Sequence, residues 1–315
     1  MGQQYSARGF LNAILRRSGK TLLVEGPSDK SAVFRLAAEK NISCECAPCI
    51  DQAALLGDDS MRGMGSKERI KMVIREAESL LEKQPKLAVK LLTLTDREWD
   101  GLRFDKLKLD GEWIPPAQQS PHFITVGHSI ENYYLNQEAI KEYLKYCFSE
   151  HVTPELLTEV STRFHRFLDL ALSYSILAKE KGLLTRCGGA ISLEYITWKN
   201  GKYYLINSFD QCLLSRGFTN AIGFSDEVNQ GIDSYHGEKC IENYSRWLFH
   251  GHLGSEAIWA CIGALARDLN FPQKVALEME RGYLKEREKY IVDWLSRTEN
   301  IQRQPLDEAI SLLYS

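Results

Sequence analysis

The segment Thr21–Lys30 reads TLLVEGPSDK, an apolar run that ends abruptly in an acidic residue. Its first part, Thr21–Val24, has the composition of a short strand that is buried on both faces. Glu25 and Gly26 follow at once, and Asp29 comes four residues after Glu25. An acid in the first turn of an amphipathic run is typical of a helix start. The segment therefore predicts a tight turn from a strand into a helix.

Two further segments repeat this pattern of an apolar run with acids at its end. The run Leu87–Thr95 is followed by Asp96, with Glu98 two residues later, and the run His122–Leu135 contains Glu131. We expect both runs to be strands, and the two acids Asp96 and Glu98 to point the same way in an extended segment. Helix-like patterns separate the three runs, and this alternation predicts a mostly parallel α/β sheet.

Helical periodicity dominates the chain after Asn136. An exception is Thr197–Ile206, where an Asn-Gly pair between β-prone residues predicts a hairpin. A further strand is expected near Ile42–Cys49, and the polar stretch Asp51–Gly65 is expected to form a mobile loop. The expected helices span residues 28–40, 66–83, 137–147, 154–167, 168–181, 255–268 and 272–296.

These patterns divide the chain into three predicted parts. Residues 1–136 form the α/β core with an acidic metal site, and residues 137–235 form a helical insertion with a hairpin. Residues 236–315 combine a basic and histidine-containing segment with C-terminal helices that pack on the core. No apolar run approaches the roughly 20 residues of a membrane span, and no apolar signal core is evident at the N-terminus. We therefore expect a cytoplasmic protein without membrane contact.

The composition sets limits on function. The 315 residues are 44% hydrophobic, which is enough for a sizeable core. The net charge of −3 argues against a generic basic coat for nucleic acid. It leaves open an enzyme that acts on nucleic acid through an acidic site filled by divalent metal, because a bound cation reverses the local charge.

The three sets of acids suggest such a site. Carboxyl ends of parallel strands lie at one edge of an open sheet, where ligands bind. Carboxylates gathered there repel one another unless they bind cations, and oxygen-only ligation suits Mg²⁺ or Mn²⁺. Gly26 would then permit unusual φ and ψ angles or a close approach of phosphate or metal to the backbone. As an alternative, Asp29 caps the following helix, and Asp96 and Asp100 form turns.

Taken in order, LLVEGPSD, LTLTDRE and HSIENYYL resemble the TOPRIM domain, most closely that of the OLD-like TOPRIM nucleases. Within that family the closest match is the branch that supplies the toxin subunit of the PARIS anti-phage defence system. The resemblance covers Lys20–Leu135 and implies a Rossmann-like sheet with flanking helices, elaborated by a helical C-terminal half. It further implies a metal-dependent endonuclease, homodimeric when active, with two Mg²⁺ or Mn²⁺ ions. The implied substrate is host nucleic acid, RNA such as tRNA first and DNA second, and a partner ABC-type ATPase sensor holds the toxin inactive.

The resemblance also assigns roles to single acids. Glu25 is a metal ligand and general base, Asp96 and Glu98 occupy an Asp-x-Asp pair, and Glu131 completes the site. Asp29 binds metal or orients a ligand. The sequence departs from the family at Glu98, which is one methylene longer than the expected aspartate and puts the metal spacing at this position in doubt.

A later basic residue is also implied, because OLD-like nucleases place one near the scissile phosphate. We assign this catalytic role to His252 in FHGHLG, and His250, His236 and Lys239 are the neighbouring alternatives. The competing interpretation of the whole chain is a TOPRIM scaffold without catalysis, acting as a regulatory interaction module of an ATPase complex.

Three other motifs give only weak indications of function. Ser18–Thr21 (SGKT) resembles a P-loop, but Ile14 occupies the first glycine position and a strand follows instead of a helix. The cysteines 44, 46 and 49 lack the second ligand pair of a zinc site. Tyr133 and Tyr134 could act as topoisomerase-type nucleophiles, but their apolar surroundings in the sequence favour core packing.

Overall fold

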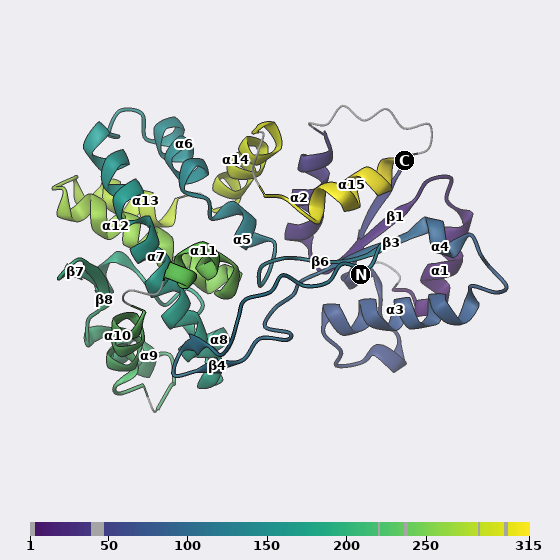
Figure 1. Cartoon of the computed structure of the whole chain (residues 1–315), viewed down its shortest axis with the longest axis horizontal. Coiled ribbons are helices and arrows are strands. Elements are labelled where there is room, and N and C mark those ends of the chain that lie inside the picture. The colour runs from purple at the N-terminus through teal and green to yellow at the C-terminus, as the bar shows by residue number, and fades with distance from the viewer. Residues whose placement is uncertain (1–3, 39–46, 220, 236–238, 283, 299–301) are drawn as a thin grey trace. The chain divides into compact units, whose positions relative to one another are not determined.

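The computed structural model describes residues 4–38, 47–219, 221–235, 239–282, 284–298 and 302–315, and Figure 1 draws their helices and strands. Contacts between Cα atoms divide the chain into two compact units. Unit 1 consists of Met1–Arg97, Pro115–Val126 and Val292–Ser315, and unit 2 of Glu98–Ile114 and Gly127–Ile291. The chain therefore passes repeatedly from one unit to the other. The three-part division at residues 136 and 235 stays a prediction.

Unit 1 is built on a parallel sheet of four strands in the order β2-β1-β3-β6. The strands are β1 (Thr21–Val24), β2 (Cys49–Gln52), β3 (Leu91–Thr95) and β6 (His122–Ile124). The side chains of the two central strands, β1 and β3, are all buried, as expected where helices cover both faces of a sheet. The predicted α/β class is therefore confirmed.

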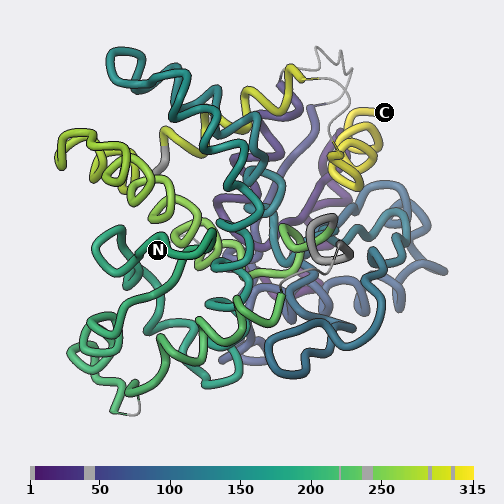
Figure 2. The backbone as a smooth tube through the Cα atoms, turned by 60° about the vertical axis from the view of Figure 1, so that its left-hand side comes forward, coloured from purple at the N-terminus to yellow at the C-terminus, as the bar shows by residue number. Residues whose placement is uncertain are grey.

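Helices cover this sheet on both faces (Figure 1). On one face, α1 (Ala7–Arg16) and α3 (Ser66–Leu80) pack with Leu23 in one apolar cluster. On the other face lie α2 (Pro27–Ala38) and the C-terminal helix α15 (Leu306–Tyr314), which contacts α2, β1 and β3. Figure 2 shows this last helix in yellow. The two ends of the sequence thus contribute to the same unit.

Several predicted boundaries in unit 1 need correction. β3 is shorter than predicted because its expected first residues form the helical turn α4 (Leu87–Lys90). β2 begins at Cys49, where the expected strand ends, and residues 42–46 lie outside the described part of the chain. The expected loop at residues 51–65 contains the end of β2 and two short 3-10 turns, η1 (Ala53–Leu55) and η2 (Asp59–Met61).

The predicted strand at residues 122–135 is wrong beyond its first three residues. β6 ends at Ile124, and after the chain enters unit 2 it forms the helical turn α5 (Glu131–Tyr134). Here the side-chain oxygen of Asn132 accepts a hydrogen bond from the Ser129 N–H at 2.8 Å. Local bonds between side chain and backbone compete with strand pairing, which explains why a β-prone sequence turns at this point.

Unit 2 is mainly helical and is organised around the long helix α7 (Pro154–Glu180). Thr153 caps its start by accepting from a backbone N–H of the first turn. α7 packs against α6 (Gln137–Cys147) and α12 (Gly251–Asp268). The prediction of two helices meeting at Phe167 is wrong, because no glycine or proline interrupts the run and every residue from Phe167 to Ala178 is buried.

The predicted hairpin is confirmed, since β7 (Ile196–Lys199) pairs antiparallel with β8 (Lys202–Leu205). The connecting Asn200 and Gly201 have φ of 53° and 74°, the positive values that a two-residue turn requires. The remaining elements are β4 (Phe104–Asp105), β5 (Lys108–Leu109), α8 (Leu184–Cys187), η3 (Leu193–Tyr195), α9 (Ser208–Ser215), α10 (Phe224–Ser234), α11 (Lys239–Leu248), α13 (Gln273–Arg281) and α14 (Leu284–Arg297).

Two properties of the helices bear on the expectations from sequence. The helix expected at residues 272–296 is interrupted after α13, where Gly282 has a φ of 42°. With a ψ of −172°, this backbone is one that residues with a side chain rarely adopt, so glycine permits the break. In the part of the chain that the structure describes, no helix is both long enough and apolar enough to span a membrane.

Candidate functional site

The centre of the unit 1 sheet carries a topological switch point. From β1 the chain crosses through α2 to β2 on one side, and then through α3 to β3 on the other side of β1. Open parallel sheets bind ligands at such a point, just outside the carboxyl ends of the strands. Glu25 directly follows β1 and Asp96 directly follows β3. Both acids therefore lie where a fold of this kind binds ligands.

Hydrogen bonds connect the acids at this edge. The Asp96 N–H donates to Glu25 Oε1 at 2.9 Å, which attaches the end of β3 to the side chain that ends β1. The Gly26 N–H donates to Asp29 Oδ2 at 2.7 Å, and Asp29 is buried in the first turn of α2. Three of the five predicted metal ligands are thus gathered by unit 1. Asp29 also binds the backbone at the start of α2, which is the alternative role that the sequence left open.

Gly26 is not required by the backbone or by the surrounding protein. Its φ is not among the positive values of the described glycines. An added Cβ would lie 3.5 Å from Asp29 Oδ2 and 3.8 Å from Ser28 Oγ, which are ordinary contact distances. The expectation of unusual φ and ψ at Gly26 is therefore wrong, whereas a close approach of a ligand to this position stays a prediction.

Two buried basic residues support the turn after β3, and sequence reasoning missed both. The Lys67 ammonium donates to the Arg97 carbonyl oxygen at 3.1 Å, and the Arg97 N–H donates to Thr125 Oγ1 at 2.9 Å. Lys67 lies in the first turn of α3, a helix that leads back to β3 and therefore starts near the carboxyl edge of the sheet. A lysine at the start of that predicted helix was the signal available in the sequence.

Glu98 does not extend the strand as expected. Its φ is 54°, so the chain turns there, and the prediction that Asp96 and Glu98 point the same way from an extended segment is wrong. The Glu98 N–H donates to the His128 carbonyl oxygen at 2.7 Å, and both residues belong to unit 2. A left-handed φ is uncommon for a residue with a side chain, and it is held here by this contact.

In unit 2 the structure pairs two of the predicted catalytic residues. His252 Nε2 lies 3.4 Å from Glu131 Oε1; the carboxylate is buried, whereas 66% of the His252 side chain is exposed. The pairing depends on Gly251, because an added Cβ there would lie 2.0 Å from Ser129 Oγ and 2.8 Å from Glu131 Oε2. The glycine therefore allows α5 to approach the start of α12 closely.

His250 is a poorer candidate for the basic residue. Its ring centroid lies 4.6 Å from that of His128, which in turn lies 4.3 Å from the Trp99 ring. Burial, and then the charge of His252, lower the pKa of His250 to about 4. The ring is therefore neutral at pH 7, which leaves the exposed His252 as the candidate from this segment.

Two more carboxylates act on His252, and sequence reasoning missed them. Burial raises the pKa of Glu288, and the charge of Glu131 raises it further, whereas His252 acts in the opposite direction. Burial also raises the pKa of Glu256, which a bond from the Gly189 N–H and the charge of His252 oppose. The exposed His252 thus lies beside carboxylates that several helices of unit 2 contribute.

The predicted site residues fall into two groups by unit. Unit 1 holds Glu25, Asp29 and Asp96, whereas unit 2 holds Glu98, together with the pair formed by Glu131 and His252. Across the described residues, no three His, Cys, Asp or Glu side chains form a group that could hold a metal ion. Convergence of all five carboxylates stays a prediction.

Other residues singled out from the sequence have simpler outcomes. Tyr133 and Tyr134 are buried, which confirms core packing. Cys49 is a free thiol. Residues 44, 46 and 236, as well as the side chain of residue 239, lie outside the described part of the structure.

Comparison of the sequence with models of known protein families finds no match, and comparison with curated proteins finds no significant match.

Proposed function

We propose that this protein is a metal-dependent nuclease with a TOPRIM-type domain, similar to the OLD-like nucleases. The observation that carries the proposal is the hydrogen bond from the Asp96 N–H to Glu25 Oε1, which joins two acids at the switch point of a parallel sheet. Acids at a ligand-binding edge suit a cation. Phosphodiester hydrolysis is a reaction class in which carboxylate-bound cations act on an anionic substrate.

The residues at this edge fit a magnesium or manganese ion. Their donors are carboxylate oxygens, which both ions prefer. Mg²⁺ usually keeps several waters and binds through one or two carboxylates together with substrate phosphates. In this proposal Glu25 and Asp96 would supply these two carboxylates. A bound ion would lower the pKa of a water and offset the charge of the phosphate. Glu98 and Glu131 remain the proposed ligands of a second ion.

The protein side chains have distinct roles in this proposal. The Glu25 carboxylate accepts a hydrogen bond from the Asp96 N–H, so the two residues are held together before any ligand binds. Lys67 and Arg97 hold the backbone of the turn that follows Asp96. In unit 2, Glu131 orients the exposed ring of His252, which can accept or donate a proton.

The biological role follows from the resemblance stated above. We propose a cytoplasmic anti-phage toxin that a partner ABC-type ATPase sensor holds inactive and releases. Its substrate would be host nucleic acid, with structured RNA such as tRNA first and DNA second, and the active form would be a homodimer. A regulatory module without catalysis is the alternative, and the experiment below separates the two.

The test compares cleavage of RNA and DNA in Mg²⁺ by the wild-type chain and by Glu25→Gln. Glutamine keeps an Oε1 acceptor for the Asp96 N–H but removes the charge, so the fold should persist. We expect cleavage to fall at least about 100-fold, with an unchanged circular dichroism spectrum and, on expression with the partner ATPase, loss of toxicity. Glu278→Gln is the matched control, because that glutamate lies in unit 2 with its side chain 53% exposed. Cleavage by a folded Glu25→Gln protein at the wild-type rate would refute the proposal.

Gly26→Ala is a second, independent variant for this test. The protein itself leaves room for the methyl group, so stability should be unchanged or slightly increased. Cleavage should fall if phosphate or metal approaches the backbone there. Gly65→Ala is the control, since an added Cβ at that position meets nothing within 4 Å.

A further inference from the structure

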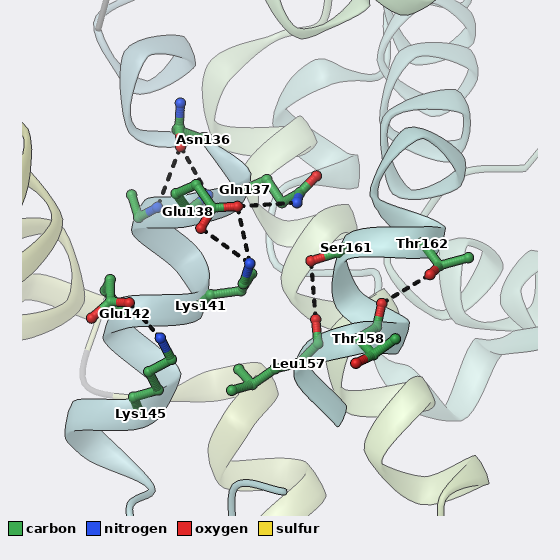
Figure 3. Close-up of polar contacts among 11 residues, drawn as sticks. Asn136, Gln137, Glu138, Lys141, Glu142, Lys145, Leu157, Thr158, Ser161 and Thr162 are labelled. Atoms are coloured by element: carbon green, nitrogen blue, oxygen red, sulfur yellow. Dashed lines mark hydrogen bonds and ion pairs between the residues drawn. The ribbon is translucent and has the colours of Figure 1, made fainter. Parts of the chain in front are cut away.

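A pocket of about 350 Å³ opens in unit 2, and none of the proposed metal ligands or catalytic residues lines it. Its walls come from the start of α6, from α7 and from the end of α11, with Gln137, Ser161, Phe164, His165 and Arg246 among the lining residues. Figure 3 shows two of these walls, with Gln137 at the start of α6 and Ser161 on α7. The volume lies at the lower end of the roughly 300–1,000 Å³ of typical ligand pockets.

Arg246 gives this pocket its chemical character. Among the described residues no carboxylate pairs with its guanidinium, whose described contact is the Trp247 ring, with Cζ 4.1 Å from the centroid. The side chain is partly buried, and burial lowers the pKa of the guanidinium. Arginine nevertheless stays charged in proteins. A partly desolvated cation without an anionic partner, facing a pocket, favours binding of an anion.

The segment HSIEN, which sequence analysis singled out for Glu131, also holds Arg246 in place. The Asn132 side-chain amide donates to the Arg246 carbonyl oxygen at 2.6 Å and to that of Phe249 at 3.2 Å. Next to it, the Tyr133 ring packs edge-on against Trp247, at 5.0 Å between centroids. The ring stacked against Arg246 is therefore itself supported, and the guanidinium is preorganised.

The other walls favour an anion as well. Asn136 caps α6 by accepting from two backbone N–H groups, so the positive end of this helix dipole lies at the pocket. The nearby carboxylates are already paired, Glu138 with Lys141 and Asp169 with Arg166, each at 3.0 Å. Among the described residues near the pocket, these two carboxylates are thus already neutralised by basic partners.

We propose that this pocket binds one phosphate group of a nucleotide or of a nucleic-acid strand. Arg246 binds the phosphate oxygens through two N–H donors, with His165 and the start of α6 beside it. Phe164 provides an apolar wall for the attached sugar or base. An arginine, a histidine and a helix start together suit a polyvalent anion better than a single carboxylate. The choice of a nucleotide phosphate rests on the proposed nuclease function, whereas the anion site rests on the pocket alone.

The experiment measures binding by calorimetry in EDTA at constant ionic strength, so that cleavage does not contribute. The probes are adenosine 5′-monophosphate and a short RNA with hydroxyls at both ends, which carries only internal phosphates. We expect Arg246→Gln to weaken binding of at least one probe by about tenfold or more, and Arg246→Lys to recover part of it. Arg62→Gln is the matched control, because that side chain is 84% exposed on the surface.

The two probes separate the sources of the phosphate. If Arg246→Gln weakens binding of the mononucleotide, the pocket binds a free nucleotide or a terminal phosphate. If it weakens binding of the RNA alone, the pocket binds an internal phosphate of a strand. If Arg246→Gln fails to fold, Ser161→Phe fills the pocket from α7 and should cause the same loss. Equal binding by wild type and folded variants, or no binding of either probe, overturns the inference. If the same protein still cleaves RNA in a separate assay with Mg²⁺, the proposed nuclease function stands although the inference about the pocket fails.

Discussion

Glu25 has a structural role that its sequence context alone does not reveal. Its carboxylate accepts the Asp96 N–H and so joins β1 to the turn after β3. A charged acceptor of a backbone N–H makes a stronger hydrogen bond than a neutral one. The same oxygen-rich edge is the proposed cation site. A residue that both supports the fold and binds the ligand has to be tested with an isosteric substitution, because alanine would remove both properties at once.

His250 makes stability depend on pH. Its pKa is lowered to about 4 in the folded protein, mainly by burial and then by His252, against an ordinary value of 6.5. Between these values the unfolded chain binds the proton more readily, so stability falls as the pH drops from 6.5 towards 4 and levels off below that. The loss from this residue should reach about 3 kcal/mol, measured by urea unfolding at several pH values.

The control for this prediction is a substitution that removes the titrating ring. His250→Gln should flatten the decline of stability between pH 6.5 and 4, whereas replacing the exposed His151 by glutamine should leave the decline unchanged. An identical pH profile for wild type and His250→Gln would contradict the assignment.

Among the secondary-structure elements, the short helix α5 shows how one turn organises several others. Glu131 faces His252 at the start of α12, Asn132 binds the end of α11, and Tyr133 packs on Trp247. Successive residues of a helical turn point in different directions, so one four-residue element reaches two neighbouring helices, α11 and α12. A strand would have sent these side chains alternately to two faces only.

The contact between α5 and α12 can be tested at Gly251. Alanine there would place its Cβ 2.0 Å from Ser129 Oγ and 2.8 Å from Glu131 Oε2, and relief of these overlaps requires a shift of the helix or of both side chains. We expect a loss of about 1–3 kcal/mol in the free energy of unfolding, together with reduced cleavage. Gly188→Ala, whose Cβ would meet ordinary contacts at 3.6 and 3.9 Å, should change neither property. Unchanged stability of Gly251→Ala would show that α5 and α12 pack more loosely than these distances indicate.

In the molecule as a whole, both compact units are built from non-contiguous segments. Unit 1 combines the N-terminal strands with the C-terminal helix α15, and the Lys20 ammonium donates to the Leu312 carbonyl oxygen at 2.9 Å. Arg35 of α2 also pairs with Asp293 at 2.7 Å. Contacts that close such long loops cost chain entropy, but the cost rises only slowly with loop length.

Removal of metal separates folding from function. The core of each unit is formed by apolar packing and backbone pairing, so EDTA should leave circular dichroism and the melting temperature almost unchanged while it abolishes nucleic-acid cleavage. Mg²⁺ or Mn²⁺ should restore cleavage and raise the melting temperature by linkage to the folded state. The rise should be smaller in Glu25→Gln. Cleavage that persists in EDTA would contradict a metal-dependent reaction.

Local pattern was sufficient for a large part of the fold. Thr21–Val24 is a buried strand because its apolar and β-branched residues suit a covered sheet. Helix α6 and the Asn-Gly hairpin also match their predictions. Such elements follow from periodicity and turn chemistry, which act over a few residues and can be read in the chain. The nearness of Glu25 and Asp96 was likewise predictable, because parallel strands bring their carboxyl ends to one edge.

The sequence pattern did not predict contacts between residues that are far apart in the chain. The α5 turn replaced a predicted strand because side-chain bonds of Asn132 outweighed β propensity. Lys67 became part of the edge only through the path of α3, and Arg246 came to line a pocket only through its surroundings in unit 2. Burial, charge pairing and close approach depend on residues far apart in the chain, so their energies arise only when the units have formed.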